Sequence, residues 1–256
     1  MLVNIFVLLI GLIIGSFLNV CISRLPKEES ILFPGSHCPK CQAKINWFDN
    51  LPLISYLLLL GKCRSCREPI SIRYPLVELI TGLAFLLLSL MPNAINSLSF
   101  YFNALFISGM IVAFFSDLET EIIPDEVIFC LIPISLLYHF FTGKIIDALL
   151  GAILGFLLLF SIQKFGKLVF KKDALGDGDV KLAALFGAAL LWPGVLLAIF
   201  MGYLLGSIEA LFLLSLKIKR MDDYIAFGPA LITGAIITLF WGQNIVEWYF
   251  RMIFNI

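Results

Sequence analysis

Eight long apolar stretches limit the folds open to this chain more than any other feature of its sequence. Most of them reach the ~17–25 residues that an α-helix needs to cross a bilayer. The sixth stretch is short, and the Trp192-Pro193-Gly194 run that follows it predicts a tight turn. We therefore predict an all-α polytopic membrane protein with about eight transmembrane helices, over roughly residues 2–20, 76–92, 98–116, 127–142, 145–163, 180–191, 195–216 and 227–248.

The amino-acid composition supports a lipid environment. Hydrophobic residues make up 61% of the 256 residues, charged residues make up 14%, and the mean hydropathy is +1.01. A soluble domain is about half apolar and about one quarter charged. The formal net charge of zero gives no reason to expect a nucleic-acid partner, so membrane lipid is the surrounding that we predict.

Basic residues gather in every second loop between the apolar stretches. Loops 21–75, 164–181 and 217–226 hold sixteen of the 18 lysines and arginines, whereas the opposite side has only Lys144 and Arg251. Cytosolic loops of membrane proteins carry an excess of these residues. We therefore expect the three basic loops in the cytosol and both termini on the outer side.

Two C-x-x-C pairs lie in the long loop 21–75, with 21 residues between them. Four thiolates in this pattern are typical of a tetrahedral zinc site with no open position, which makes the metal structural. Disulfides are disfavoured because the cytosol is reducing. We predict a small zinc-ribbon-like cytosolic domain whose ligands are Cys38, Cys41, Cys63 and Cys66; redox-active or free thiols are the alternative.

Two clusters of acidic residues lie at the predicted cytosolic ends of apolar stretches. Asp117 and Asp125 belong to "SDLETEIIPDE", and Asp177 and Asp179 belong to "LGDGDVKL". Two carboxyl groups brought together share a proton, and such a dyad hydrolyses peptides: one carboxylate activates water while its protonated partner polarises the scissile carbonyl. The alternative is that Asp117 merely ends one helix and that Asp179 is the N-cap of the next.

The order of these motifs resembles that of the type IV prepilin leader peptidases, which are bacterial membrane aspartic proteases of the GxGD kind. The resemblance covers nearly the whole chain. The GxGD pattern falls on Gly176 to Asp179, and the cysteine pairs are similar to the cytosolic zinc-type domain of the family. The other similar segments are "GSFLNVCISRLP" (15–26), "ISIRYPLVELITG" (70–82), "SDLETEIIPD" (116–125) and "FGPAL" (227–231).

The resemblance implies an activity, a location and a domain organisation. Such enzymes remove the short basic leader from type IV prepilins and type II secretion pseudopilins, usually between a glycine and a phenylalanine. The chain would lie in the bacterial inner membrane, with its zinc loop and active site on the cytosolic side. Residues 1–20 would form the first transmembrane helix, 21–75 the cytosolic loop, and 76–256 a membrane aspartic peptidase domain of about seven helices. Neither the individual pilin nor an oligomeric state follows from the sequence.

The resemblance also implies roles for residues of the two acidic clusters. Asp117 and Asp179 would be the catalytic pair, and Asp125 competes with Asp117 for the first place. Asp177 occupies the variable position of the GxGD pattern and would tune its neighbour. The glycines, Gly176 and Gly178, would let a substrate strand come close to the backbone.

Many members of the family then methylate the new N-terminal amine with S-adenosylmethionine. The chain contains no glycine fingerprint of a Rossmann cofactor domain. If the activity is present, we expect the cofactor near Glu78 and Gly82, at the start of the second apolar stretch. The carboxylate of Glu78 would stabilise the positive charge of the bound cofactor. A Glu78–Arg73 ion pair is the alternative reading. Two other functions stay open: a peptidase without methyltransferase activity, or a small cation transporter.

Overall fold

The computed structural model describes residues 2–91, 97–170, 175–218 and 226–254. In this part of the chain the regular secondary structure is helical, apart from two isolated β-bridges. Four of the basic loop residues, Lys171, Lys172, Lys219 and Arg220, lie outside the described residues. The α-helices are α1 (Leu2–Arg24), α2 (Ile54–Leu58), α3 (Arg73–Ser89), α4 (Leu98–Thr120), α5 (Asp125–Phe141), α6 (Ile145–Phe170), α7 (Asp177–Ser215) and α8 (Gly228–Phe254), and two 3₁₀ turns are η1 (Leu25–Lys27) and η2 (Trp47–Asn50).

The prediction of an all-α membrane protein is confirmed. Among the described residues, five helices are long and apolar enough to cross a membrane: α1, α4, α6, α7 and α8. The second and fourth predicted stretches lie in α3 and α5, which have 17 residues each. The sixth and seventh predicted stretches both lie within α7, which has 39 residues. Each of the eight stretches therefore corresponds to a helix or to half of one.

The chain folds back on itself in the middle of α7. Leu191 has φ 66° and ψ 173°, which no α-helix contains. A side chain at Gly155 of α6 would touch both Ala183 and Val195, although an unbroken helix would separate these two residues by about 18 Å. The reversal lies one residue before the predicted Trp192-Pro193-Gly194 turn, so α7 consists of two antiparallel halves.

A histidine of α5 stabilises this reversal. The Ala189 carbonyl has no helical partner four residues on, because the chain turns at Leu191 and because Pro193 has no N–H. The Nε2 atom of His139, which is 5% exposed, lies 3.0 Å from the Ala189 oxygen and donates the missing hydrogen bond.

The contacts divide the chain into two compact units, residues 1–112 and 113–256. In the first unit α1 packs closely on α3. A side chain at Gly11 would begin 2.8 Å from the Gly82 Cα atom, and one at Gly15 would begin 2.7 Å from the Glu78 Cα atom. Glycines therefore bring the two backbones into contact, which is a common way for helices to associate in lipid.

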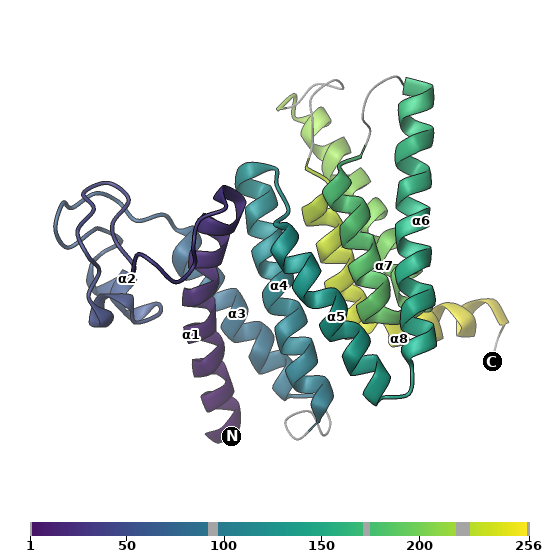
Figure 1. Cartoon of the computed structure of the whole chain (residues 1–256), viewed down its shortest axis with the longest axis horizontal. Coiled ribbons are helices and arrows are strands. Elements are labelled where there is room, and N and C mark those ends of the chain that lie inside the picture. The colour runs from purple at the N-terminus through teal and green to yellow at the C-terminus, as the bar shows by residue number, and fades with distance from the viewer. Residues whose placement is uncertain (1, 92–96, 171–174, 219–225, 255–256) are drawn as a thin grey trace. The chain divides into compact units, whose positions relative to one another are not determined.

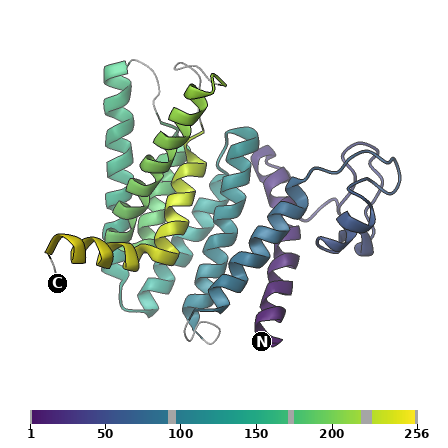
Figure 2. The same ribbon diagram turned by 180° about the vertical axis from the view of Figure 1, so that it is seen from behind.

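In the second unit α7 is the central element, with α6, α8 and α5 packed against it. Gly187 of α7 lies against the backbone of Gly151 in α6, and Gly202 of α7 against Leu231 of α8. Figures 1 and 2 show that the last part of α8 turns away from the direction of its first part. These close crossings fix the first residues of α7 and α8, which carry the site described next.

Candidate functional site

Asp117 and Asp179 are both buried and lie near each other in the second unit. Asp117 stands in the last turn of α4 and is 5% exposed, and Asp179 stands in the first turn of α7 and is 4% exposed. The charge of Asp117 acts directly on Asp179. Buried carboxyl groups are costly, and two that lie near each other are a candidate proton-sharing pair.

The first residue of α8 supports Asp117. The backbone N–H of Gly228 donates a hydrogen bond to the Asp117 carboxylate, as the free N–H groups at a helix N-terminus favour. A Cβ atom on Gly228 would lie 2.5 Å from the Oδ2 atom of Asp117. The glycine of "FGPAL" is therefore required by this close approach, and Pro229 suits the first turn of a helix because it needs no N–H partner there.

An isoleucine connects the two acidic segments. A Cβ atom at Gly228 would lie 3.2 Å from Cδ1 of Ile123, and one at Gly178 would lie 3.3 Å from its Cβ atom. Ile123 thus packs between the glycine before Asp179 and the glycine that supports Asp117. The GxGD glycine Gly178 faces this side chain and leaves little room for a larger residue.

Asp177 is bound to a different helix. The Nε2 atom of the buried Gln163 in α6 donates to the Asp177 Oδ1 atom at 2.8 Å and to the Leu175 carbonyl at 3.1 Å. These two bonds hold the loop before α7 against α6, a contact that the sequence did not predict. Asp177 and Asp179, two residues apart, therefore have different partners.

The N-cap reading of Asp179 is wrong. α7 begins at Asp177 and its N-cap is Gly176, so Asp179 is the third residue of the helix. Its Oδ2 atom accepts a hydrogen bond from the Gly176 N–H at 3.3 Å. The carboxylate reaches back over the first turn, as the acidic residue of a capping box does.

Asp125 lies in a different environment from Asp117. It is the first residue of α5, its side chain is 48% exposed, and its Oδ1 atom forms an ion pair with the Lys181 Nζ atom at 2.7 Å. Asp125 is thus exposed and has a lysine partner, whereas Asp117 is buried. Of the two candidates in the first cluster, Asp117 is the one that is buried near a second carboxyl group, as an aspartic dyad requires.

Tyr203, in the second half of α7, was not predicted as a site residue. Its hydroxyl is buried without a hydrogen-bond partner in the described part of the chain, and the charge of Asp179 acts on it. Its ring lies 4.7 Å from that of Phe227, next to Gly228. The only sequence signal for this residue was its place in an apolar stretch, and the reversal at Leu191 that brings it to Asp179 is a tertiary feature.

The four cysteines of the loop lie together in the first unit. Their Sγ atoms are all within 4.8 Å of one another, and the Cys38 and Cys66 sulfurs are 3.9 Å apart. Tetrahedral zinc with Zn–S bonds of about 2.3 Å requires S···S distances of about 3.8 Å. The backbone N–H groups of Cys66 and Ser65 lower the pKa of the Cys63 thiol to about 7, which favours the thiolate that a metal needs. The donor set fits a zinc ion.

The two cysteine pairs form a structural repeat that the sequence analysis missed. The first cysteine of each pair donates to the carbonyl five residues on, Cys38 to Ala43 at 2.9 Å and Cys63 to Glu68 at 2.8 Å. The fourth residue after it, Gln42 or Arg67, has positive φ and donates back to the cysteine carbonyl. The repeated hydrogen bonds join backbone atoms, which every residue has. The C-x-x-C spacing is therefore the sequence signal for this repeat.

Glu78 and Gly82, the predicted cofactor residues, lie in the α1–α3 packing. Glu78 is 8% exposed, its Oε2 atom accepts the Leu53 N–H at 2.8 Å, and Ser16 is a second hydrogen-bond partner. A side chain on Gly82 would begin 2.8 Å from Leu12. The negative charge of Glu78 suits the positively charged sulfonium of S-adenosylmethionine. Close packing against Leu12 is enough to explain a glycine at position 82. A cofactor role for either residue stays a prediction.

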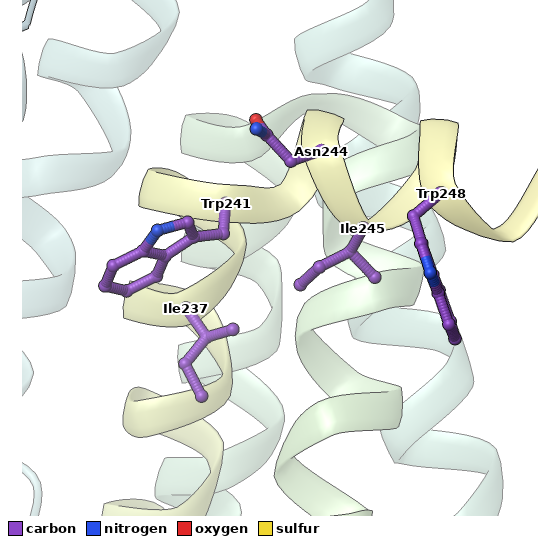
Figure 3. Close-up of a pocket in the computed structure, with 5 residues that line it drawn as sticks. All are labelled: Ile237, Trp241, Asn244, Ile245 and Trp248. Atoms are coloured by element: carbon purple, nitrogen blue, oxygen red, sulfur yellow. The ribbon is translucent and has the colours of Figure 1, made fainter.

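An apolar hollow of about 330 Å³ lies elsewhere, where α8 changes direction. Figure 3 shows its lining, all from α8: Ile237, Trp241, Asn244, Ile245 and Trp248. No titratable group lines it, so it offers no acid–base chemistry. Its two tryptophans are instead of the kind that gather at a membrane–water interface.

Comparison with known proteins gives one family match in each of two parts of the chain. The family model described as the bacterial peptidase A24 N-terminal domain matches residues 9–91, which include the four cysteines and Glu78. The model of the type IV leader peptidase family matches residues 104–211, which include Asp117 and Asp179. No solved structure matches the chain.

Relatives that cover nearly the whole chain carry the same name, prepilin leader peptidase/N-methyltransferase. The one from Aeromonas salmonicida (strain A449) is 34% identical over 96% of this chain and 94% of its own length. The one from Pseudomonas aeruginosa is 34% identical over 95% and 92%, and the one from Neisseria gonorrhoeae 35% over 89% and 87%. With both family models and these relatives in agreement, the chain belongs to the type IV leader peptidase family.

Proposed function

We propose that this protein removes the leader peptide from type IV prepilins and type II secretion pseudopilins and then methylates the new N-terminus. The observation that supports the peptidase best is the pair of buried carboxyl groups, Asp117 and Asp179, at close range. The relatives' shared name supports the substrate class and the second activity. A transporter would hold its acids near the middle of the bilayer, whereas these two stand in the last turn of α4 and the first turn of α7.

In the proposed mechanism Asp117 and Asp179 act as one unit. One carboxylate takes a proton from the attacking water, and the other, protonated, donates a hydrogen bond to the scissile carbonyl oxygen. The hydrogen bonds from Gly228 to Asp117 and from Gly176 to Asp179 hold both groups in place before substrate arrives. Asp125 remains outside the pair because Lys181 binds it.

The location that we propose is the cytosolic face of the bacterial inner membrane. The basic loops next to the site favour a cytosolic position by the positive-inside rule. A prepilin has a basic leader and an apolar helix, so the bond between them lies at this same face. Cleavage of a purified prepilin by the purified full-length protein in detergent tests the proposal: the shortened product is the expected result, and an unprocessed prepilin would contradict it.

Gly228→Ala is expected to lower the rate of leader cleavage by about 100-fold, the effect of misplacing a reacting group by about 1 Å. The added methyl group would displace the Asp117 carboxylate, whose Oδ2 atom lies 2.5 Å from its position. Gly242→Ala, in the same helix, is the matched control, because its methyl group meets only side chains at 3.1 Å or more. Single-turnover cleavage rates measure the effect; equal rates for both variants would mean that Gly228 does not support Asp117.

For methyl transfer, we propose Glu78 as the residue that holds the positive charge of S-adenosylmethionine. When bound, this cofactor supplies an electrophilic methyl group, and the substrate amine must be unprotonated to accept it. Glu78→Gln keeps an acceptor for the Leu53 N–H but removes the charge. We expect normal cleavage and at least about tenfold slower methylation, since stabilising a charge in a dry site is worth several kcal/mol.

The mass of the mature N-terminal peptide measures methylation separately from cleavage. Glu209→Gln is the control, because it removes one exposed carboxylate from another helix, α7. If Glu78→Gln methylates at the wild-type rate, Glu78 serves only to bind Leu53.

We also propose that the four cysteines hold a structural zinc ion. Their thiolates would complete a tetrahedral shell with no open position for a substrate, so the metal would stabilise the loop rather than catalyse. Residues 25–72 contain only short helical pieces, η1, η2 and α2, and a metal would supply the stability that so small a core cannot.

A further inference from the structure

The segment around α2, in the loop between α1 and α3, exposes most of its large apolar side chains. On and next to α2 the exposed fractions are 55% for Ile54, 71% for Leu57, 78% for Leu58 and 84% for Leu60. Trp47 in η2 is 78% exposed. Contiguous exposed apolar surface of this kind marks a contact with a partner or a membrane.

The polar residues of the same segment face the loop itself. The Ser55 hydroxyl is buried, donates to the Phe48 carbonyl at 2.8 Å and accepts the Leu51 N–H at 3.1 Å. The Tyr56 hydroxyl donates to the Ile70 carbonyl at 3.4 Å. A loop folded for water would turn these residues out and the leucines in; this one has the arrangement of a surface in contact with lipid.

Contacts within the first unit show where α2 begins along the length of the α1–α3 helix pair. Leu53, the residue before α2, donates its N–H to Glu78 in α3, and Glu78 packs against Gly15 of α1. Gly15 lies nine residues before the end of α1 at Arg24, which is about 13 Å along the helix axis at 1.5 Å per residue. α2 therefore starts beside the membrane-crossing part of α1 rather than beyond its end.

The residues that follow the apolar segment are basic. Lys62 and Arg67 are exposed and follow Leu60 closely, and the exposed Arg64 between them forms an ion pair with Asp49 at 2.6 Å. Lysine and arginine next to an apolar surface complement the anionic headgroups of the cytosolic leaflet. Lys62 and Arg67 thus suit the anionic surface of a membrane, which the exposed leucines beside them can enter.

We propose that residues 51–60, the α2 segment, are inserted into the cytosolic leaflet of the membrane beside α1 and α3. Leu57, Leu58 and Leu60 enter the boundary between headgroups and acyl chains, as the apolar face of an interfacial helix does. The basic residues after Leu60 stay at the headgroups. The cysteine-bearing loop is then held flat on the cytosolic surface of the membrane. The inference uses the membrane position of the proposed function but not its chemistry.

Tryptophan fluorescence in nanodiscs tests the insertion with the full-length protein. Leu58→Trp is made in a background in which Trp47, Trp192, Trp241 and Trp248 are replaced by phenylalanine. In nanodiscs of phosphatidylethanolamine and phosphatidylglycerol, we expect blue-shifted emission and about twofold or stronger quenching when the acyl chains are brominated, as for an apolar face buried at this depth. Glu68→Trp in the same background, exposed in the second cysteine loop, is expected to show neither effect.

Two outcomes would overturn the inference. One is a Leu58→Trp signal that is as insensitive to brominated lipid as the Glu68→Trp control. The other is a signal that responds only when a prepilin is added, which would assign the segment to the substrate. If the Leu58→Trp variant fails to fold, judged by its helix content, Leu60→Trp is measured in its place and decides.

The same nanodiscs separate this inference from the proposed function. Cleavage of an added prepilin without quenching at Leu58 means that the insertion alone is wrong. Quenching without cleavage means that the peptidase alone is wrong.

Discussion

Replacing either Asp117 or Asp179 by asparagine is expected to slow leader cleavage by at least about 1000-fold, the range of a lost general acid–base group. Asparagine has the shape of aspartate, but it can neither take a proton from water nor share one with the other carboxylate. Because the two groups act as one unit, the double variant should be little slower than either single variant. Single-turnover rates with a purified prepilin give the three numbers.

Asp125→Asn is the matched control for this series. Asp125 carries the same charge in the same acidic cluster, but it is exposed and bound to Lys181, so its replacement should change the rate by less than about threefold, as for a surface ion pair. Thermal unfolding of each variant checks that the fold is kept. Normal cleavage by folded Asp117→Asn and Asp179→Asn proteins would end the dyad proposal, and a loss only in Asp125→Asn would move the first catalytic acid to α5.

Replacing Cys38 and Cys63 by serine is expected to abolish zinc binding. The change removes one thiolate from each cysteine pair, so neither half of the four-sulfur cluster is complete. Binding of structural zinc contributes about 10–16 kcal/mol in zinc-finger peptides, and this free energy is also folding free energy. We expect one zinc per wild-type chain, none in the variant, and rapid cleavage of the variant loop by trypsin at its lysines and arginines.

Cys130→Ser provides the control for the cysteine experiment. Cys130 is exposed on α5 and lies outside the cluster, so this variant should keep its zinc and the protease resistance of its loop. Elemental analysis of protein purified without added metal measures the zinc content. Equal zinc in wild type and in the Cys38→Ser, Cys63→Ser protein would exclude a site at these cysteines.

The features that the sequence predicts well are those with a short-range physical cause. Runs of apolar residues predict helices because a backbone in lipid must satisfy its own hydrogen bonds, and each of the eight runs coincides with a helix or half of α7. The reversal near Leu191 was also predicted, since Pro193 cannot donate and Gly194 tolerates unusual backbone angles. The C-x-x-C spacing likewise predicts four converging sulfurs, because each pair fits one tight turn.

The features that were missed depend on which distant segments meet. Nothing in "FGPAL" alone says that the Gly228 N–H binds Asp117, and nothing near Gln163 says that it binds Asp177 across α6 and α7. The His139–Ala189 bond joins residues 50 positions apart. These contacts arise from helix packing, and the local pattern of a single sequence does not contain them. The N-cap error has the same form, since Gly176 and Asp179 are both good residues for a helix start and the pattern does not choose between them.

The central claim is that this chain cuts prepilins with Asp117 and Asp179, and the intact mass of a pilin tests it most directly. A type IV prepilin is co-expressed with the full-length protein in bacteria that lack a leader peptidase of their own, and the pilin is purified and weighed. We predict one species, shorter by the leader and heavier by one methyl group, and the unprocessed prepilin when Asp179→Asn replaces the wild type. A leader that stays intact beside folded wild-type protein in the membrane, or one that is removed equally well by Asp179→Asn, would contradict the account.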